Sequence, residues 1–466
     1  MFYYERVNQF DTIAVSVDSV DRRRIKGTID LDGLKFIMYF DYTQDVDIDY
    51  DLAGMIMTMP VINYAYFAKR IKLNFPVSLS FLKLVKEFIR INNIETFINS
   101  IVRRRYEFFL KEYLPSDEEI TQENAEGRTE VLADISDGDK KKLEVDDRKV
   151  IVLSSGGKES LLTFGILKEI GAVVYPVFFN ESGAHWKTAK VAYDYFSSKY
   201  ENVLRVWSNV DRFYSFVNRH LKILDQDEIR RKADSYPVQM FIFPVYIFSV
   251  LPYVIKYGIG NIALGDELDD PIYEEPYHGI KHYYGVYDQT NDFNLTLTSF
   301  LREYGIHCKV FSAVYPIFGT LVEKILVQRY NDLFRVQRSC HLCHYEGGDV
   351  KPCGTCSKCL GVLLFMLNAE ADPTEAGYSI EHVKQLEDNV NSASMRLDPD
   401  ELEYLKAKVF EGRRINSHIE GIHQLPGENS AFSLVPERFR DGVRSIVSKY
   451  STGFYKFVGS EWVKID

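Results

Sequence analysis

The segment 149–160 constrains the fold of this chain more than any other part of it. A β-branched apolar run, Val150 to Leu153, is followed by the small residues 154–157 and then by apolar residues at helical spacing from Ser160 to Leu167. This order predicts a strand, a tight glycine turn and a helix. Glycine lets a backbone approach an anion closely, and the N–H groups of a helix N-terminus favour negative charge. The segment therefore predicts a loop that cradles a phosphate, with Lys158 supplying a positive charge.

The glycine pattern of this loop distinguishes it from two common nucleotide-binding loops. It lacks the Gly-x-x-x-x-Gly-Lys-Ser/Thr of the common ATPase loop and the third spaced glycine of dinucleotide-binding turns. The run Ser155-Gly156-Gly157-Lys158-Glu159-Ser160 instead resembles the Ser-Gly-Gly-x-Asp-Ser signature of the PP-loop ATP pyrophosphatases. The resemblance implies that the loop binds the pyrophosphate of ATP and that AMP is transferred to a substrate oxygen. It also implies that Glu159, at the position of the family's Asp, holds Mg²⁺. The competing interpretation is an ordinary glycine turn.

Strand and helix patterns alternate after this loop. Four more strands are predicted, at 172–179, 203–207, 261–265 and 309–314. Strands separated by helical patterns indicate a parallel sheet with helices on both faces. The predicted fold class is therefore α/β, with a doubly wound parallel five-stranded sheet. The PP-loop resemblance implies the adenine-nucleotide α-hydrolase-like (HUP) type.

Ligands of such a sheet lie beyond the carboxyl ends of its strands. Asn180 follows the second strand and is placed for adenosine, whereas the acidic run 265–270 follows the fourth and is placed for Mg²⁺, ribose or substrate. Within that run, Asp269 and Asp270 fit an acidic turn before Pro271 equally well. The predicted ATP-binding residues are Ser154, Ser155, Gly156, Gly157, Lys158, Glu159, Ser160, Asn180, Gly265, Asp266 and Glu267. The predicted catalytic residues are Lys158, Glu159 and Lys324, the last in a helix after the fifth strand.

The cysteines gather in one short region. Six occur in the chain, and five of them fall between Cys340 and Cys359. Cys-x-x-Cys steps place two thiolates at one corner of a tetrahedron, so four of the five predict a closed, structural Zn²⁺ site. Thiolates at this spacing also hold iron–sulfur clusters. Disulfides are a third interpretation, which a cytosolic setting and the odd number of cysteines disfavour.

The spacing within the cysteine cluster points to a narrower family. The run Cys353-Gly354-Thr355-Cys356-Ser357-Lys358-Cys359, preceded by Ser339-Cys340, resembles the zinc knot of the 7-cyano-7-deazaguanine synthases. The resemblance covers 149–368 and implies that these enzymes' use of ATP to activate a carboxylate and form a C–N bond extends to this chain. The implied zinc ligands are Cys340, Cys353, Cys356 and Cys359, with Cys343 as the alternative first ligand.

A second family has a similar overall plan. The ATP-dependent UDP-N-acetylmuramoyl-L-alanyl-L-glutamate epimerases also have an N-terminal domain before the glycine loop, a loop that Asp288-Gln289 matches in part, and a comparable cysteine pattern. They too adenylate a carboxylate. Both resemblances imply ATP-dependent adenylation of a small-molecule carboxylate, with ATP, Mg²⁺ and Zn²⁺ as cofactors, and neither fixes the substrate.

Two other functions stay open. Modification of a tRNA base by thiolation needs a catalytic cysteine, for which Cys308 is the one candidate outside the cluster, and a basic surface. The net charge is −11, from 56 basic and 67 acidic residues, which argues against a broad grip on nucleic acid. The second open function is that of a non-catalytic nucleotide-sensing module with a zinc-bearing interaction surface.

Composition along the 466 residues predicts several domains. They are an α+β domain at 1–115, a charged linker at 116–148, the ATP-binding domain at 149–335, the zinc knot with its following helix at 336–368, and a helical region at 369–466. The sequence leaves open whether the last region packs on the core or mediates homo-oligomerisation. The chain has no run of about 18 apolar residues and no signal-peptide pattern, so we expect a cytoplasmic protein that does not contact a membrane.

Overall fold

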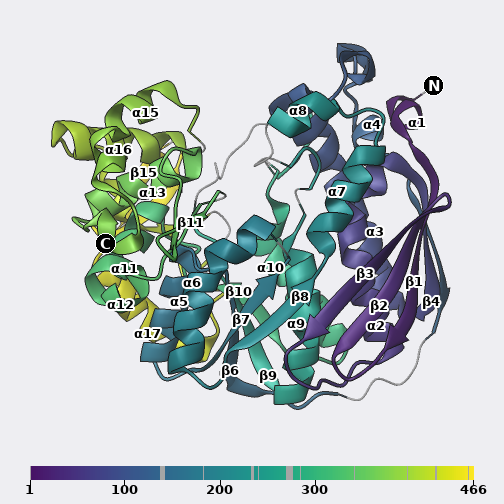
Figure 1. Ribbon diagram of the computed structural model, residues 1–466, viewed down its shortest axis with the longest axis horizontal. Coiled ribbons are helices and arrows are strands. Elements are labelled where there is room, and N and C mark those ends of the chain that lie inside the picture. The colour runs from purple at the N-terminus through teal and green to yellow at the C-terminus, as the bar shows by residue number, and fades with distance from the viewer. Residues whose placement is uncertain are drawn as a thin grey trace. The chain divides into compact units, whose positions relative to one another are not determined.

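The computed structural model shows an α/β protein (Figure 1). It describes residues 2–136, 142–181, 183–231, 236–239, 241–268, 276–283, 285–340, 342–395, 397–425, 428–459 and 461–465. The chain divides into two compact units. Unit 1 comprises 1–145, 206–258 and 273–308, and unit 2 comprises 146–205, 259–272 and 309–466. The sequence predicts domains that follow one another along the chain, whereas each of these units is assembled from three separate segments.

The sheet of unit 2 is parallel. Its strands are β6 (Asp146–Ser154), β7 (Val173–Asn180), β9 (Ile259–Leu264) and β10 (Lys309–Ser312), in the order β10-β9-β6-β7. Val150 of β6 pairs with Val174 on one side and Asn261 on the other, and every pair in this set is parallel. The strands predicted at 150–153, 172–179, 261–265 and 309–314 are thus confirmed. Their near-continuous apolar character fits a sheet that is buried on both faces.

The strand predicted at 203–207 also exists; it neighbours β7 in the strand order, and its other neighbour is a strand of unit 1. β8 (Leu204–Ser208) crosses the boundary between the units, and its residues 206–208 pair antiparallel with 40–42 of β3 in unit 1. The sheet is therefore larger than a self-contained set of five parallel strands. Pairing with a strand more than 150 residues away leaves no local sequence signal.

Unit 2 has one hydrophobic core, to which the C-terminal region contributes. Leu161 of the helix after β6, Phe365 of the helix after the cysteines, and Leu405 and Val447 near the C-terminus are all buried in it. The helices of unit 2 are α5 (Lys158–Glu169), α6 (Gly183–Lys199), α11 (Gly319–Arg329), α12 (Asn331–Phe334), α13 (Ser357–Asn368), η7 (Pro373–Ala376), α14 (Ile380–Lys384), α15 (Leu386–Ser392), α16 (Pro399–Glu411), η8 (Ser417–Glu420) and α17 (Glu437–Ser448).

The sequence predicts a helical C-terminal region, whereas the structure also has strands there. Three short strands, β13 (Ile422–Gln424), β14 (Phe454–Val458) and β15 (Glu461–Ile465), form a separate sheet in which β13 and β14 are parallel and β15 is antiparallel to β14. A hairpin, β11 (His344–Glu346) and β12 (Asp349–Lys351), interrupts the cysteine cluster. Strands of three to five residues are too short for their periodicity to be read from sequence.

Unit 1 mixes antiparallel and parallel pairing. Its strand order is β8-β3-β2-β1-β4-β5; β3-β2-β1 is an antiparallel meander, and β1-β4-β5 is parallel. Its strands are β1 (Phe10–Val20), β2 (Arg24–Leu31), β3 (Leu34–Tyr42), β4 (Ala68–Val77) and β5 (Glu130–Ile135). Its helices are α1 (Tyr3–Val7), α2 (Tyr50–Thr58), η1 (Met59–Phe67), α3 (Leu79–Glu95), the π-helix η2 (Thr96–Arg104), η3 (Tyr106–Phe108), η4 (Lys111–Tyr113), η5 (Asp117–Glu119), α4 (Gln122–Glu126), α7 (Val210–His220), α8 (Gln226–Arg231), α9 (Phe243–Tyr257), η6 (Tyr287–Gln289) and α10 (Asn291–Glu303).

Part of the segment predicted as a charged linker, 116–148, has regular structure. It contains η5, α4 and β5, and β5 adds a parallel strand beside β4. Local capping explains why so polar a segment is ordered. The Thr121 hydroxyl accepts from the Asn124 N–H, and Asn124 is buried while donating to the Glu119 carbonyl. Residues 137–141 of this segment lie outside the described part of the chain.

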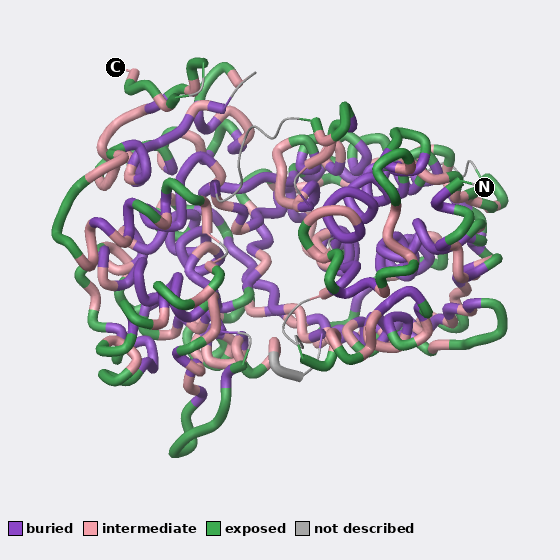
Figure 2. Tube along the Cα trace, turned by 90° about the horizontal axis from the view of Figure 1, so that it is seen from above, coloured by how far each residue is buried: buried purple, intermediate pink, exposed green. Residues whose placement is uncertain are grey.

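In both units, the extent of burial differs between the interior elements and the outer loops. Figure 2 shows buried residues gathered along the interior elements and exposed ones in the outer loops. In the part of the chain that the structure describes, no helix is both long and apolar enough to cross a membrane.

Candidate functional site

The predicted phosphate loop has the expected form in the structure. β6 ends at Ser154, the chain turns through 155–157, and α5 begins at Lys158. Gly156 has φ +81°, which a residue with a side chain adopts only with strain. The hydroxyls of Ser155 and Ser160 brace the turn, because they accept from the N–H groups of Gly157 and Ser155, each at 3.3 Å. Among the described residues no side chain caps α5, so its N-terminus is open to an anion.

Lys158 is buried and lies between two glutamates. Its Nζ donates to Glu159 Oε1 at 2.5 Å and also to Glu267. Burial opposes the charged form of the lysine, but the two carboxylates outweigh that effect and raise its pKa. For Glu159 burial opposes ionisation, and the positive charges of Lys158 and Lys358 outweigh it and lower its pKa. The Phe365 ring lies 5.0 Å from Nζ, so the cation also meets an aromatic face. The predicted loop lysine is thus neutralised by protein carboxylates.

The loop after β9 packs against the start of α5, as the sheet rule predicts. A Cβ built at Gly265 would lie 3.1 Å from the Ser160 nitrogen, so only glycine fits there without a shift of the backbone. Asp266 is buried, and its carbonyl accepts from the Ser312 hydroxyl at 2.7 Å. Asn180 is the last residue of β7. Asp269 and Asp270 lie outside the described residues.

Lys324 is engaged elsewhere. Its Nζ donates to Glu420 at 2.9 Å and to the Tyr450 carbonyl at 3.1 Å, so it binds α11 to the C-terminal region. Lys324 is predicted as catalytic, and the contacts that the structure gives it are of a structural kind. The sequence cannot reveal this, because both partners lie about 100 residues further along the chain.

Two buried glutamates near Lys158 could not be identified from the sequence. Glu323 Oε2 accepts from Gln337 at 3.0 Å, and Glu401 Oε1 accepts from the N–H and the hydroxyl of Thr320 at 2.7 and 2.8 Å. Both residues are fully buried, and the other oxygen of each has no partner among the described residues. Burial raises the pKa of Glu323 to about 8 and that of Glu401 to about 7, and the charge of Lys158 opposes both shifts. Neither glutamate belongs to a recognisable motif.

Four of the clustered cysteines converge. The sulfur atoms of Cys340, Cys353, Cys356 and Cys359 lie within 4.8 Å of one another, a group that could hold a metal ion such as zinc. This is the predicted ligand set with Cys340 as its first member. Cys343, the alternative first ligand, is buried but does not belong to the group. His341, between the two, lies outside the described residues.

The cysteine cluster is attached directly to the phosphate loop. The N–H of Arg338, which is two residues before Cys340, donates to the Gly156 carbonyl at 2.9 Å. Ser339 Oγ lies 3.6 Å from the position that a Cβ would take at Gly157. On the other side, the Thr188 hydroxyl of α6 donates to the Cys340 carbonyl at 2.7 Å. The Ser-Cys pair that helps to define the zinc-knot pattern therefore lies at the loop.

Two further residues singled out in the sequence lie in unit 1. The Asp288 carboxylate accepts from the N–H groups of Ile242 and Phe243 at 2.7 and 2.9 Å, at the N-terminus of α9, and burial raises its pKa to about 6. Cys308 is buried, which raises the pKa of its thiol. A buried thiol with a raised pKa is a poor nucleophile.

Comparisons with known proteins add no family to this geometry. No protein-family model matches the chain, and no curated protein matches it significantly.

Proposed function

We propose that unit 2 binds ATP and adenylates a small-molecule carboxylate, with AMP and pyrophosphate as the final products. The observation that carries the proposal is the backbone hydrogen bond from Arg338 to Gly156, because it joins the uncapped glycine loop to the four-cysteine cluster. The two sequence patterns that resemble PP-loop enzymes of the zinc-bearing type are thus parts of one site.

The strand order supports a nucleotide at this position. β6 lies between β7, which follows it in the chain, and β9, so the direction in which the sheet is built reverses between β6 and β9. Ligands of parallel sheets bind in the crevice at such a reversal. The loop 155–157 and Gly265 flank it. We assign the five strands β6 to β10 to a sheet of the adenine-nucleotide α-hydrolase-like type.

The residues of the loop would act by positioning charge. The first N–H groups of α5 and the hydroxyls of Ser155 and Ser160 would hold the pyrophosphate of ATP, and Asn180 would lie on the adenosine side. Glu159 and Glu267 would rearrange from Lys158 toward Mg²⁺, which is held mainly by phosphates and needs only one or two carboxylates. Lys158 would then be released toward the leaving pyrophosphate and offset its developing charge.

The cysteine cluster would be structural. Zn²⁺ with four thiolates has no open position for a substrate, so its contribution is to fix 338–340 against the loop. Buried Cys308 gives no support to a thiolation reaction. The proposal leaves the acceptor unspecified, and both a C–N bond-forming synthase and an epimerase share the adenylation step.

Isotope transfer tests the proposal directly. The protein is incubated with ATP, Mg²⁺ and a panel of acids whose carboxylates carry ¹⁸O, and AMP is analysed by mass spectrometry. An acid that is adenylated leaves one ¹⁸O on AMP, because the acyl–oxygen bond breaks when the adenylate reacts on. Formation of ADP, or AMP without label for every acid, would contradict the proposal.

A matched pair of glycines supplies the control. Gly156→Ala places a side chain at φ +81° with Ala192 Cβ 3.2 Å away, inside the loop, whereas Gly171→Ala places one at φ +85° with open space around it. The backbone strain of the two variants is similar. We expect only Gly156→Ala to abolish AMP formation.

A further inference from the structure

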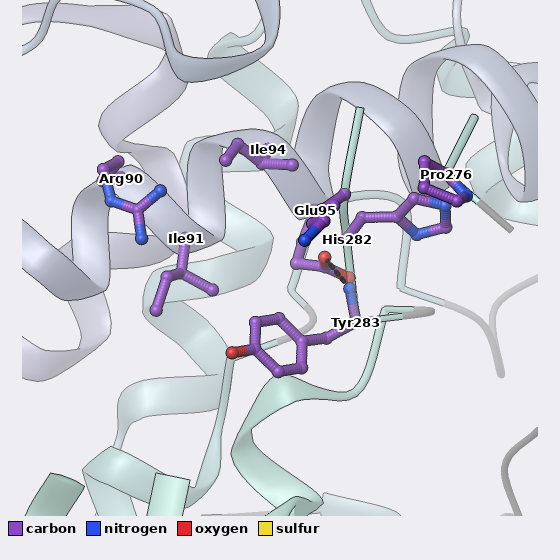
Figure 3. Close-up of a pocket in the computed structure, with 8 residues that line it drawn as sticks. Arg90, Ile91, Ile94, Glu95, Pro276, His282 and Tyr283 are labelled. Carbon is purple, nitrogen blue, oxygen red and sulfur yellow. Dashed lines mark hydrogen bonds between the residues drawn. The ribbon is translucent and has the colours of Figure 1, made fainter. Parts of the chain in front are cut away.

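Unit 1 contains a pocket that the proposed adenylation does not use. It has a volume of about 550 Å³ and lies between the C-terminal half of α3 and the segment 276–283. Figure 3 shows Arg90, Ile91, Ile94 and Glu95 on the helix and Tyr283 on the opposing segment. The volume is within the range of sites that bind small organic molecules.

The wall opposite α3 is held in one conformation by a tight turn. Tyr277 and Ile280 exchange backbone hydrogen bonds of 3.1 and 2.8 Å, and the two residues between them, His278 and Gly279, have φ values of +49° and +79°. Positive φ at both central positions is the type I′ geometry of a two-residue hairpin. The guanidinium of Arg103 lies 4.9 Å from the centre of the Tyr277 ring and fixes the turn to η2.

Glu95 fixes the other end of this wall. It is 3% exposed, and its carboxylate accepts from the Tyr283 N–H at 2.6 Å, from the Gly285 N–H, and from Asn99 Nδ2 at 2.9 Å. Asn99 Nδ2 also lies 3.3 Å from Nδ1 of His282. Glu95 therefore serves the wall, and its negative charge is already met by N–H donors.

The remaining lining combines apolar surface with cations. Ile91, Ile94 and Pro276 contribute aliphatic surface. Arg90 is held by a two-point ion pair with Glu87, at 3.0 and 2.8 Å, which uses two of its five N–H donors, and its Nη1 lies 3.9 Å from Glu126 Oε1. Lys281 also lines the pocket and is exposed.

We propose that this pocket binds a small organic molecule that joins an oxyanion, carboxylate or phosphate, to an apolar body. The oxyanion lies at Lys281 and the outer donors of Arg90, and the apolar body lies along Ile91, Ile94 and Pro276. Arginine favours planar oxyanions because its N–H donors match their geometry. The site is independent of the nucleotide loop, so it stands even where no acid is adenylated.

Fluorine NMR on the full-length protein tests the site. The probes are 4-(trifluoromethyl)benzoate, 4-(trifluoromethyl)phenyl phosphate and, as the neutral analogue, 4-(trifluoromethyl)benzyl alcohol, and their line broadening gives Kd. Saturating ATP and Mg²⁺ are present throughout to occupy the nucleotide loop. We expect at least one anionic probe to bind about tenfold more tightly than the alcohol, since one ion pair contributes on the order of 1 kcal/mol. The two anionic probes separate the carboxylate from the phosphate as the natural group.

Two charge reversals decide whether the signal arises in this pocket. Lys281→Glu removes the cation from the lining, and Lys86→Glu makes the same change in charge on the exposed face of α3. We expect Lys281→Glu to weaken binding of the anionic probe about tenfold and Lys86→Glu to leave it within twofold. Ile94→Trp, which fills the pocket, should abolish binding while far-ultraviolet circular dichroism stays unchanged. Equal loss in both lysine variants, or equal binding of the alcohol, would overturn the proposal.

Discussion

The phosphate loop of unit 2 and the pocket of unit 1 each contain a buried charge, and they stabilise it in opposite ways. Lys158 is neutralised by full charges, the carboxylates of Glu159 and Glu267. Among the described residues, Glu95 accepts hydrogen bonds from two backbone N–H groups and the amide of Asn99. A buried ion pair has a strong dependence on each partner, whereas hydrogen bonds from N–H groups spread the stabilisation over several donors.

This difference predicts how each region responds to a cation or to an amino-acid substitution. The lysine group of unit 2 carries an excess negative charge, with Glu323 and Glu401 nearby as additional acids, so it favours an incoming cation and can rearrange around one. Two of the donors around Glu95 are the backbone N–H groups of Tyr283 and Gly285, so the glutamate orders a pocket wall that does not need a ligand. We therefore expect changes in unit 2 to have the larger effects.

Loss of the metal site should have the largest effect. Cys359→Ser removes a buried ligand from α13 inside the core of unit 2, and loss of a structural metal together with a core contact should destabilise by several kcal/mol. Zinc content is measured by elemental mass spectrometry, and hydrogen exchange reports each unit. Exchange should rise in α5 and α13 and stay slow in β1 and α3.

Cys343→Ser is the matched control for the metal site. The residue is buried in the same region but lies outside the group of four sulfur atoms, so full zinc content is expected. Zinc loss in Cys343→Ser with retention in the variant of Cys340, tested in parallel, would reverse the assignment of the first ligand.

Removal of the buried cation should have the next largest effect. Lys158→Met leaves the partly buried carboxylates of Glu159 and Glu267 without the cation that lies between them, and breaking a fully buried pair costs about 3–5 kcal/mol, which is the upper bound here. Urea denaturation gives the change in the free energy of unfolding. The double variant Lys158→Met with Glu267→Gln removes one of the two carboxylate charges and should recover part of the loss. A double variant as unstable as Lys158→Met alone would show that the ion pair is not the cause.

Titration of Glu323 should produce a smaller effect that depends on pH. Burial holds its pKa at about 8 in the folded protein, above its ordinary value of 4.5. The folded state therefore binds this proton more tightly, so the contribution to stability is complete below about pH 4.5 and is lost as the pH rises through 8. Glu323→Gln stays neutral and should be more stable than the parent at pH 8, by on the order of 2 kcal/mol, with little difference at pH 4.5.

The strand, glycine turn and helix at 149–160 and the convergence of four cysteines could be predicted because their signals are local. Val150–Leu153 with the glycines that follow, and the Cys-x-x-Cys steps, each lie within about a dozen residues. The role of Lys324, the buried Glu401 and the strand pairing of β8 depend on residues some 80 to 170 positions away, and no periodicity records such contacts. The pocket at Glu95 could not be predicted from the sequence for the same reason. Its helix reads as an ordinary amphipathic one, and the wall that completes it comes from 276–283.

Glu95→Gln is the sharpest test of the contrast, and its effect should be the smallest. The amide keeps one acceptor oxygen, but its NH₂ group faces an N–H donor, which leaves one hydrogen bond unmade and costs about 1–2 kcal/mol. The loss should be local, with faster hydrogen exchange at Tyr283 and Gly285 and weaker probe binding in the pocket. Glu87→Gln, on the exposed side of the same helix, should leave that exchange unchanged. A loss as large as that of Lys158→Met would show that Glu95 depends on its charge, and the distinction between the two regions would then fail.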